Sequence, residues 1–297
     1  MTVTEEMMSE MTFGCELEYE GISQVTAAKT VAEVTGGTAR YEGTHLSNWV
    51  VTMPDGRRWQ VVSDGSLRGT SSETVTPILK VADIEMLQEV VRALKRNGAK
   101  VNERTGLHVH VGAKDLTPAQ IKNLVRIFYK QETLILKAIG TRPSRLGWYT
   151  RPTDKAFVDK ICKMPSPTME KLNTAWFGAY TPNPYHYNDH RYRALNLNNL
   201  WGRDAKHTVE LRCFEGTTHA GVIRANVLLA ILLVLKAKSA KAASAKNPRP
   251  YSETSAKYDL RVFLLRLGMI GDYYKNPRKH LMKNMPGSAA WKNGRRD

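Results

Sequence analysis

Acidic and imidazole side chains recur at alternate positions in short, strand-like segments of this chain. The pairs are Glu16 with Glu18, His108 with His110, and Glu210 with Arg212, and Glu73 lies in a fourth such segment. Because successive side chains of a strand point to opposite faces, each pair projects from one face of a sheet. Several acids on one face need a counter-charge. Carboxylates with one imidazole are typical ligands of Mg²⁺ or Mn²⁺, whereas a zinc site would use more His and Cys.

An Arg two residues beyond a metal-binding Glu has a distinct chemical use. Arg212 can neutralise a phosphate or a developing negative charge beside Glu210. The sequence has neither a G-x-x-x-x-G-K-[ST] phosphate loop nor a G-x-G-x-x-G motif after a strand. Each pair alone has a plainer explanation, as a solvated strand face, polar residues at a sheet edge, or a cross-strand salt bridge. Their joint occurrence favours a site.

The periodicity of apolar residues predicts the elements that position these side chains. Strands are expected over 13–20, 107–113, 192–200 and 207–214, with a hairpin over 49–62 that turns at Asp55-Gly56 and a further strand within 64–79. Helices are expected over 23–34, 82–97, 117–139, 221–238 and 258–267. Strands arranged as hairpins and runs with helices inserted predict an α+β fold with a mainly antiparallel sheet.

Residues 140–192 break the regular pattern, with six prolines and many aromatic residues. Irregular segments of this length are usually functional or disordered. We consider this stretch a candidate lid that excludes water and selects an acceptor, with a partly ordered surface excursion as the alternative. The residues to test first are Arg142, Arg145, Tyr149 and Arg151.

Cysteine usage and hydropathy predict a reduced, cytoplasmic protein. The three cysteines, Cys15, Cys162 and Cys213, are too few and too scattered for a disulfide framework. Cys15 and Cys213 alternate with the polar residues and should be core side chains. The longest apolar run, 227–235, is far shorter than the roughly 20 residues that span a bilayer, so we expect a buried helix and no membrane partner. The acidic N-terminus lacks the order of a signal peptide.

The net charge of +16 is concentrated at the C-terminal end. Residues 236–297 carry a net +11, which excludes a uniformly basic coat. We therefore expect a catalytic domain over 1–238 and a basic helical extension over 239–297, joined through a small-residue linker near 238–250. Within 271–297, Lys and Arg are interleaved with Tyr and Trp, a pattern found in segments that contact nucleic acid or another anionic polymer and also on solvated helix faces.

Five motifs in this order resemble the amidoligase family: FGCELEYE, DGSL…SETVTPIL, TGLHVHVGA, RYRALNL and TVELRCFEGT. The resemblance covers roughly residues 12–235, and the family is similar to glutamine synthetase and gamma-glutamylcysteine ligase. It implies a glutamine synthetase-like fold, in which a curved antiparallel half-barrel sheet has helices on its outer face. It further implies two or three Mg²⁺ or Mn²⁺ ions around the phosphates of ATP. ATP would phosphorylate a carboxylate, and an amine would displace phosphate from the acyl phosphate.

The resemblance also assigns roles to individual residues. The metal ligands it implies are Glu16, Glu18, Glu73, His108 and Glu210. His110 would face the substrate or the transferring phosphate, and Arg212 would bind phosphate. Either Arg191 or Arg193 would add a phosphate contact, and the sequence does not choose between them. Asp64 would bind a substrate amine or hold a turn.

The favoured hypothesis is thus an ATP- and metal-dependent carboxylate–amine ligase. The sequence does not decide among peptides, cell-wall precursors and nucleobases as its substrates. One alternative is a carboxylate or guanidino kinase, which would share the phosphate-transfer step and stop at a phosphorylated product. Another is a nucleic-acid-binding protein that acts through its basic C-terminal segment.

Overall fold

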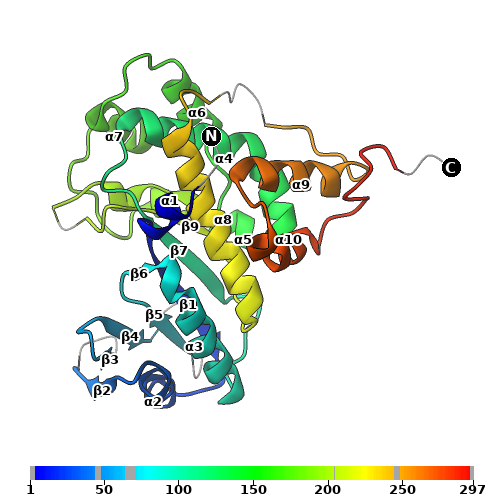
Figure 1. Ribbon diagram of the computed structural model, residues 1–297. Helices are drawn as coiled ribbons and strands as arrows, with labels where there is room; N and C mark the ends of the chain where they lie inside the picture. The colour runs from blue at the N-terminus through cyan, green and yellow to red at the C-terminus, as the bar shows by residue number, and fades with distance from the viewer. Residues whose placement is uncertain (1–3, 44–47, 64–70, 204, 244–247, 295–297) are drawn as a thin grey trace.

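The computed structural model describes residues 4–43, 48–63, 71–203, 205–243 and 248–294. Within these residues nine strands form one antiparallel sheet, and ten α-helices pack around it (Figure 1). The strands are β1 (Thr12–Glu20), β2 (Thr38–Tyr41), β3 (Trp49–Thr52), β4 (Arg58–Val62), β5 (Ser71–Val75), β6 (Leu79–Lys80), β7 (Gly106–Gly112), β8 (Leu195–Asn196) and β9 (Thr208–Glu215). The helices are α1 (Glu5–Ser9), α2 (Gln24–Thr35), α3 (Ile84–Arg96), α4 (Pro118–Ile139), α5 (Pro143–Trp148), α6 (Lys155–Cys162), α7 (Met169–Phe177), α8 (Ala220–Ser239), α9 (Ala256–Leu267) and α10 (Lys275–Met282).

The sheet is open rather than closed into a barrel. Its strand order is β2-β3-β4-β5-β1-β7-β9-β8, and the short β6 also pairs with β1. The three strands that carry the paired polar residues, β1, β7 and β9, are therefore neighbours near one end of the sheet. The expected α+β class with an antiparallel sheet is confirmed.

Local sequence signals set the helix ends. The Ser23 hydroxyl accepts a hydrogen bond from the amide of Thr26 and caps α2. Thr117 caps α4 in a reciprocal arrangement with Gln120, and Pro118 occupies the first turn. Gly140 ends α4 with φ of 73°, a left-handed conformation that costs glycine little. These ends lie within about a residue of those expected from the sequence.

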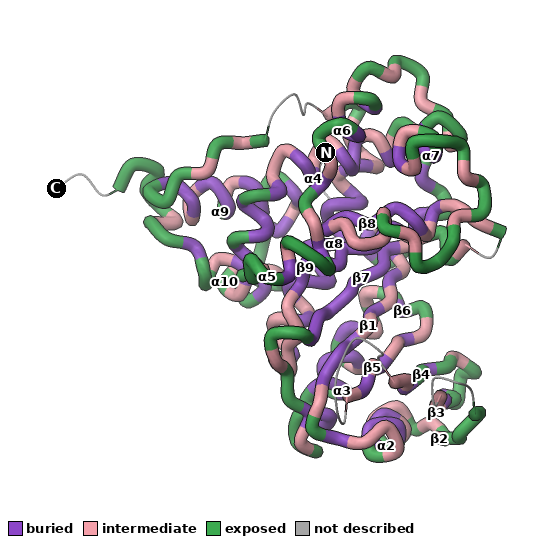
Figure 2. The backbone as a smooth tube through the Cα atoms, turned by 180° about the vertical axis from the view of Figure 1, so that it is seen from behind, coloured by how far each residue is buried: buried purple, intermediate pink, exposed green. Residues whose placement is uncertain are grey.

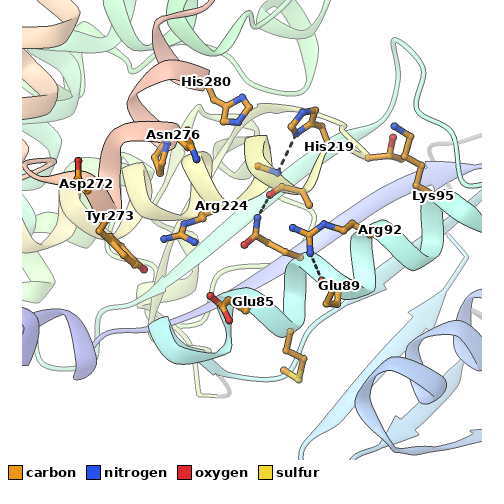
Figure 3. Close-up of a pocket in the computed structure, with 16 residues that line it drawn as sticks. Glu85, Glu89, Arg92, Lys95, His219, Arg224, Asp272, Tyr273, Asn276 and His280 are labelled. Carbon is orange, nitrogen blue, oxygen red and sulfur yellow. Dashed lines mark hydrogen bonds and ion pairs between the residues drawn. The ribbon is translucent and has the colours of Figure 1, made fainter.

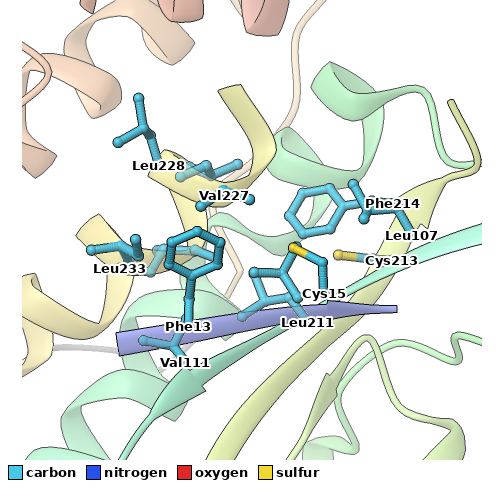
Figure 4. Close-up of a cluster of buried hydrophobic side chains, with 14 of the residues drawn as sticks. Phe13, Cys15, Leu107, Val111, Leu211, Cys213, Phe214, Val227, Leu228 and Leu233 are labelled. Atoms are coloured by element: carbon cyan, nitrogen blue, oxygen red, sulfur yellow. The ribbon is translucent and has the colours of Figure 1, made fainter. Parts of the chain in front are cut away.

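The hydrophobic core lies between the sheet and α8. Phe13 and Cys15 of β1, and Leu211 of β9, point from the sheet toward Val227 and Leu233 of α8 (Figure 4). Figure 2 shows that most residues of β7, β9 and α8 are buried, whereas buried and half-buried residues alternate along the first part of β1. Because side chains alternate, the site residues of these strands project from the opposite face.

Helix α8 is long and apolar enough to cross a membrane by length and composition. However, 78% of its apolar window is buried inside the protein. It contacts α3, α4, α10 and β7. This is a core helix, as its apolar sequence predicts, and it does not indicate a membrane protein.

The expected strand over 192–200 is wrong in extent. Only Leu195 and Asn196 form a strand, opposite Leu211 and Glu210 of β9, and 3₁₀ turns flank them. The Asn196 side-chain oxygen accepts a hydrogen bond from the amide of Asn198 at 2.9 Å. Such side chain-to-backbone bonds favour turns over strands, so the apolar alternation does not continue as a ladder.

The segment 140–192 contains the short helices α5, α6 and α7 with loops between them, as expected. Helices α6 and α7 pack on α4 and on each other. At the C-terminal end, α9 and α10 pack against α4 and α8 (Figure 1). Leu281 and Met269 are buried there in the common core, so the basic helical extension over 239–297 packs on the rest of the molecule.

Candidate active site

The register of β1, β7 and β9 brings the predicted acids and histidines together. Glu16 lies opposite His108, and His110 lies opposite Glu210. The His108 Nδ1 is 2.8 Å from Glu16 Oε2, and the His110 Nε2 is 3.1 Å from Glu16 Oε1. All four side chains are largely buried, with Glu16 the most exposed at 17%. Glu16 is thus the centre of the cluster.

Three of these side chains form a compact donor set that suits a metal ion. One oxygen each of Glu16 and Glu210 and one nitrogen of His110 lie within 4.8 Å of one another. Two carboxylates with one imidazole are a donor set for Mg²⁺ or Mn²⁺. The resemblance had assigned His108 to metal and His110 to substrate, whereas this geometry groups His110 with the acids. His108 is also close to the acids, with its Nδ1 3.7 Å from Glu210 Oε1 and its Nε2 3.5 Å from Glu18 Oε1, so its predicted role as a metal ligand stays a prediction.

Strong local fields keep the two central acids ionised. Burial raises the pKa of Glu16, but His110 and the hydrogen bond from His108 outweigh it and hold that pKa well below its usual range. Burial also opposes ionisation of Glu210, yet Arg212 and then His110 lower its pKa from 4.5 to about 2. Both carboxylates are therefore negative at neutral pH, as metal ligands must be.

Arg212 and Asn196 orient Glu210 from two sides. The Arg212 Nη1 donates to Glu210 Oε1 at 2.5 Å, and the Asn196 Nδ2 donates to Glu210 Oε2 at 2.8 Å. Arg212 is only 6% exposed, and burial disfavours its charge, but Glu210 and Glu16 raise its pKa above the ordinary value. The Arg212 Nε is buried without a hydrogen-bond partner among the described residues.

Glu18 and Glu73 lie one step further along the same sheet face. They are opposite each other on β1 and β5. Glu18 Oε2 accepts a hydrogen bond from the amide of Gly106 at 2.5 Å, which fixes its position. The structure therefore places all five expected metal ligands on one sheet face. The compact donor set comprises Glu16, Glu210 and His110, and Glu18 and Glu73 stand beside it.

A cavity of about 590 Å³ opens over this cluster. Glu16, His110, Glu210 and Arg212 form one part of its lining, and segments 183–191 and 196–206 supply the rest. Arg191 lines the cavity, with its guanidinium over the rings of Tyr187 and Tyr192 at 5.2 and 5.6 Å. Arg193 turns away and donates to the carbonyl of Pro152. Of the two candidates, Arg191 is thus the one at the site.

Sequence reasoning missed several residues of this cavity. They are Tyr185, His186, Asn196, Asn199 and Lys206. The Lys206 Nζ is 3.6 Å from Glu16 Oε1, and the Asn199 Nδ2 is 3.4 Å from Glu210 Oε2. Asn196 alternates with the apolar residues of ALNLNNL, which was a signal for a polar face. The others lie in aperiodic sequence that gave no indication of their placement.

The four residues chosen within 140–192 for testing do not belong to the described lining of this cavity. They are Arg142, Arg145, Tyr149 and Arg151. Arg145 is 3% exposed, and its Nη1 donates to the carbonyl of Thr105 at 3.1 Å. Arg142 and Arg151 form ion pairs away from the acids, with Glu215 and Asp189. Only the end of that stretch, 183–191, reaches the cavity. Asp64 lies outside the described residues.

The two core cysteines face away from the site, as predicted. Cys15 and Cys213 are buried on the α8 side of the sheet (Figure 4). Burial raises the pKa of the Cys15 thiol far above its ordinary value and that of Cys213 to about 12. Neither thiol is suited to be a nucleophile, which leaves the acids, histidines and cations as the chemical groups of the site.

A family description, "Putative amidoligase enzyme", matches residues 9–234. The chain belongs to the amidoligase family. The match spans β1 to most of α8 and so contains every residue of the acid cluster, and it indicates a ligase-type enzyme. Among curated proteins, none matches the chain significantly. Residues 236–297, which carry a net charge of +11 and include α9 and α10, lie beyond the matched region.

Proposed function

We propose that this amidoligase is an ATP-dependent carboxylate–amine ligase that works with Mg²⁺ or Mn²⁺ held by Glu16, His110 and Glu210. The observation that carries the proposal is the donor set of two ionised acids and one imidazole at the base of a cavity that also has cations in its lining. Glu18, Glu73 and His108 stand beside this set and would support further ions in a glutamine synthetase-like arrangement.

The cations of the cavity support a role in phosphate chemistry. Phosphoryl transfer requires charge neutralisation and alignment more than covalent participation by the protein. A bound divalent ion would draw negative charge from the phosphates of ATP. Arg212, whose Nε has no hydrogen-bond partner among the described residues, and Arg191, whose guanidinium lies over the rings of two tyrosines, are placed to bind oxygens of the transferred group. Lys206 is a third cation in the lining of the cavity.

The proposed reaction has two stages. A carboxylate oxygen of the first substrate attacks the terminal phosphorus of ATP, the bond to the bridging oxygen breaks, and ADP leaves. An amine then attacks the acyl carbon, and phosphate departs as the amine loses a proton. The acyl phosphate must be kept from water, and the wall formed by 183–191, with Tyr185 and His186, is suited to cover it. A kinase would perform only the first stage.

Product analysis tests this proposal. The protein is incubated with ATP, Mn²⁺ and a panel of amino acids, polyamines and peptides, and products are read by mass spectrometry. Formation of an amide with one ADP and one phosphate per bond supports a ligase. ADP with a phosphorylated product and no amide, across the panel, contradicts the ligase and identifies a kinase.

Variants tie the activity to the cluster. Glu16→Gln and Glu210→Gln should abolish substrate-dependent ATP turnover, because each removes one charged ligand. Glu42→Gln is the matched control, since Glu42 is 45% exposed just beyond β2 and pairs with Arg58 at the surface. Full turnover in both cluster variants would contradict the proposal.

A further inference from the structure

A second polar surface lies on α10, far along the chain from the acid cluster. A groove of about 670 Å³ is lined there by five cations: Lys257, Lys275, Arg278, Lys279 and Lys283. His219 and His280 complete its polar lining, and the described lining includes no acidic residue. Its lining comes from α10, the start of α9 and the start of α8. All of its charged residues are basic, and Val222 and Met282 add apolar surface between them.

The cations of this groove are not neutralised by the protein. Among the described residues, none of the five forms an ion pair, although the chain contains surface ion pairs elsewhere. Arg278 is held by the carbonyl oxygens of Met269 and Gly271, at 2.7 and 3.2 Å. Like charges held together without counter-ions repel one another. A bound anion would reduce this electrostatic repulsion, so binding of an anion is favoured.

Helix α10 presents its lysines in a regular row on a fixed support. Lys275, Lys279 and Lys283 are spaced by four residues, which puts them on one helix face at a rise of about 6 Å per step. The opposite face of α10 is anchored through the buried Leu281 against α8. A row of cations on a rigid helix suits a ligand with regularly repeated negative charges.

The groove is separate from the proposed catalytic cavity. The acids of the catalytic cluster project from the sheet face opposite α8, whereas α10 packs on α8 itself. The family match ends at residue 234, before all five cations. The charge is therefore not explained by the chemistry common to the family.

We propose that this groove binds the phosphodiester backbone of a single-stranded nucleic acid. Its repeated cations match the regular spacing of charge along a phosphodiester backbone. An adjoining hollow of about 870 Å³ shares His219 and His280 with the groove and contains Tyr273 (Figure 3). Tyr273 is 48% exposed, so part of its ring is open to a base that stacks beside the strand.

The charges of the adjoining hollow indicate which part of the strand would lie there. Three acids, Glu85, Glu89 and Asp272, line it together with three cations, Arg92, Lys95 and Arg224 (Figure 3). The Arg224 guanidinium lies over the Tyr273 ring at 4.4 Å. Because these charges balance, the phosphates should prefer the row of lysines in the groove, while a base occupies the hollow.

The salt dependence of binding tests the proposal. A fluorescent single-stranded DNA of about 12 nucleotides, a length within the usual site sizes, is titrated with the full chain at several salt concentrations. The triple variant Lys275→Gln, Lys279→Gln and Lys283→Gln loses up to three phosphate contacts. The slope of log affinity against log salt should fall in magnitude by about 2, and affinity at about 0.1 M salt by about 100-fold.

Matched controls separate the groove from net charge. The triple variant Lys160→Gln, Lys163→Gln and Lys171→Gln removes the same charge from exposed positions on and beside α6 and α7. It should retain the affinity and slope of the unmodified chain. An equal loss in the control, or no binding by the unmodified chain at low salt, would overturn the proposal. Binding to phosphatidylserine vesicles without oligonucleotide binding would overturn it in favour of a membrane.

Discussion

Removal of the Arg212 guanidinium should destabilise the metal-free protein, because it leaves buried carboxylates without their nearest cation. Burial disfavours the charge of Glu210, yet Arg212 and then His110 lower its pKa from 4.5 to about 2. A difference of this size between folded and unfolded states corresponds to about 3 kcal/mol of stability at neutral pH. Loss of one partner of a buried ion pair costs about 3–5 kcal/mol, which is the same range. We therefore expect Arg212→Met to lose about 3 kcal/mol.

The dependence on pH distinguishes this cause from simple loss of packing. The pKa of Glu210 is depressed in the folded state, so its contribution is fully present above the unfolded pKa and declines as pH falls toward about 2. The cost of Arg212→Met should accordingly shrink to less than half by about pH 3. Urea unfolding followed by circular dichroism, with EDTA present, measures both values.

A matched control uses the other cation near the cluster. Lys206 is 57% exposed and lies 3.6 Å from Glu16 Oε1, so Lys206→Met should cost less than about 1 kcal/mol. A loss below about 1 kcal/mol for Arg212→Met at neutral pH, or a loss that does not change with pH, would refute the electrostatic reasoning.

Three further changes test how the site is supported. Gly106→Ala should lower the free energy of unfolding in urea by about 1–3 kcal/mol, because an added Cβ would lie 2.5 Å from the buried Nη2 of Arg145. Unchanged stability would show that this guanidinium moves freely. Asn196→Ala should weaken Mn²⁺ binding about 10- to 100-fold by calorimetry, since it removes the amide that orients a ligating carboxylate; wild-type affinity would contradict that role. Cys15 and Cys213 should react with a thiol reagent at least about 100-fold more slowly in the native protein than in urea, because burial raises both pKa values; equal rates would mean that the sheet opens readily.

The part of the site that lies on regular strands was predictable from sequence. Strict alternation around Glu16, His108 and Glu210 defines which side chains share a face, and strand neighbours in an antiparallel sheet place them together. Helix starts were predictable for the same local reason, as Thr117 and Pro118 show. In each case the residues that determine the strand face or the helix start lie within a few positions of one another in the sequence.

The remaining wall of the site depends on contacts between distant residues. Apart from the short alternation around Asn196, segment 183–206 has no period, and it is held by individual bonds such as that between the indole of Trp176 and the side chain of Asn198 at 2.8 Å. The orientations of Arg191 and Arg193 differ because one stacks on tyrosines and the other reaches Pro152. Neither partner follows from periodicity, so the choice between the two Arg residues required the structure.

The central claim, that the acid cluster supports ATP-dependent amide formation, is tested most directly by one comparison. Amide product is measured by mass spectrometry with ATP and Mn²⁺ for the unmodified chain, for Glu210→Gln and for the surface control Glu42→Gln. We predict amide formation by the unmodified chain and the control and none by Glu210→Gln. Undiminished amide formation by Glu210→Gln, or ADP without amide from every chain and acceptor tested, would contradict the account.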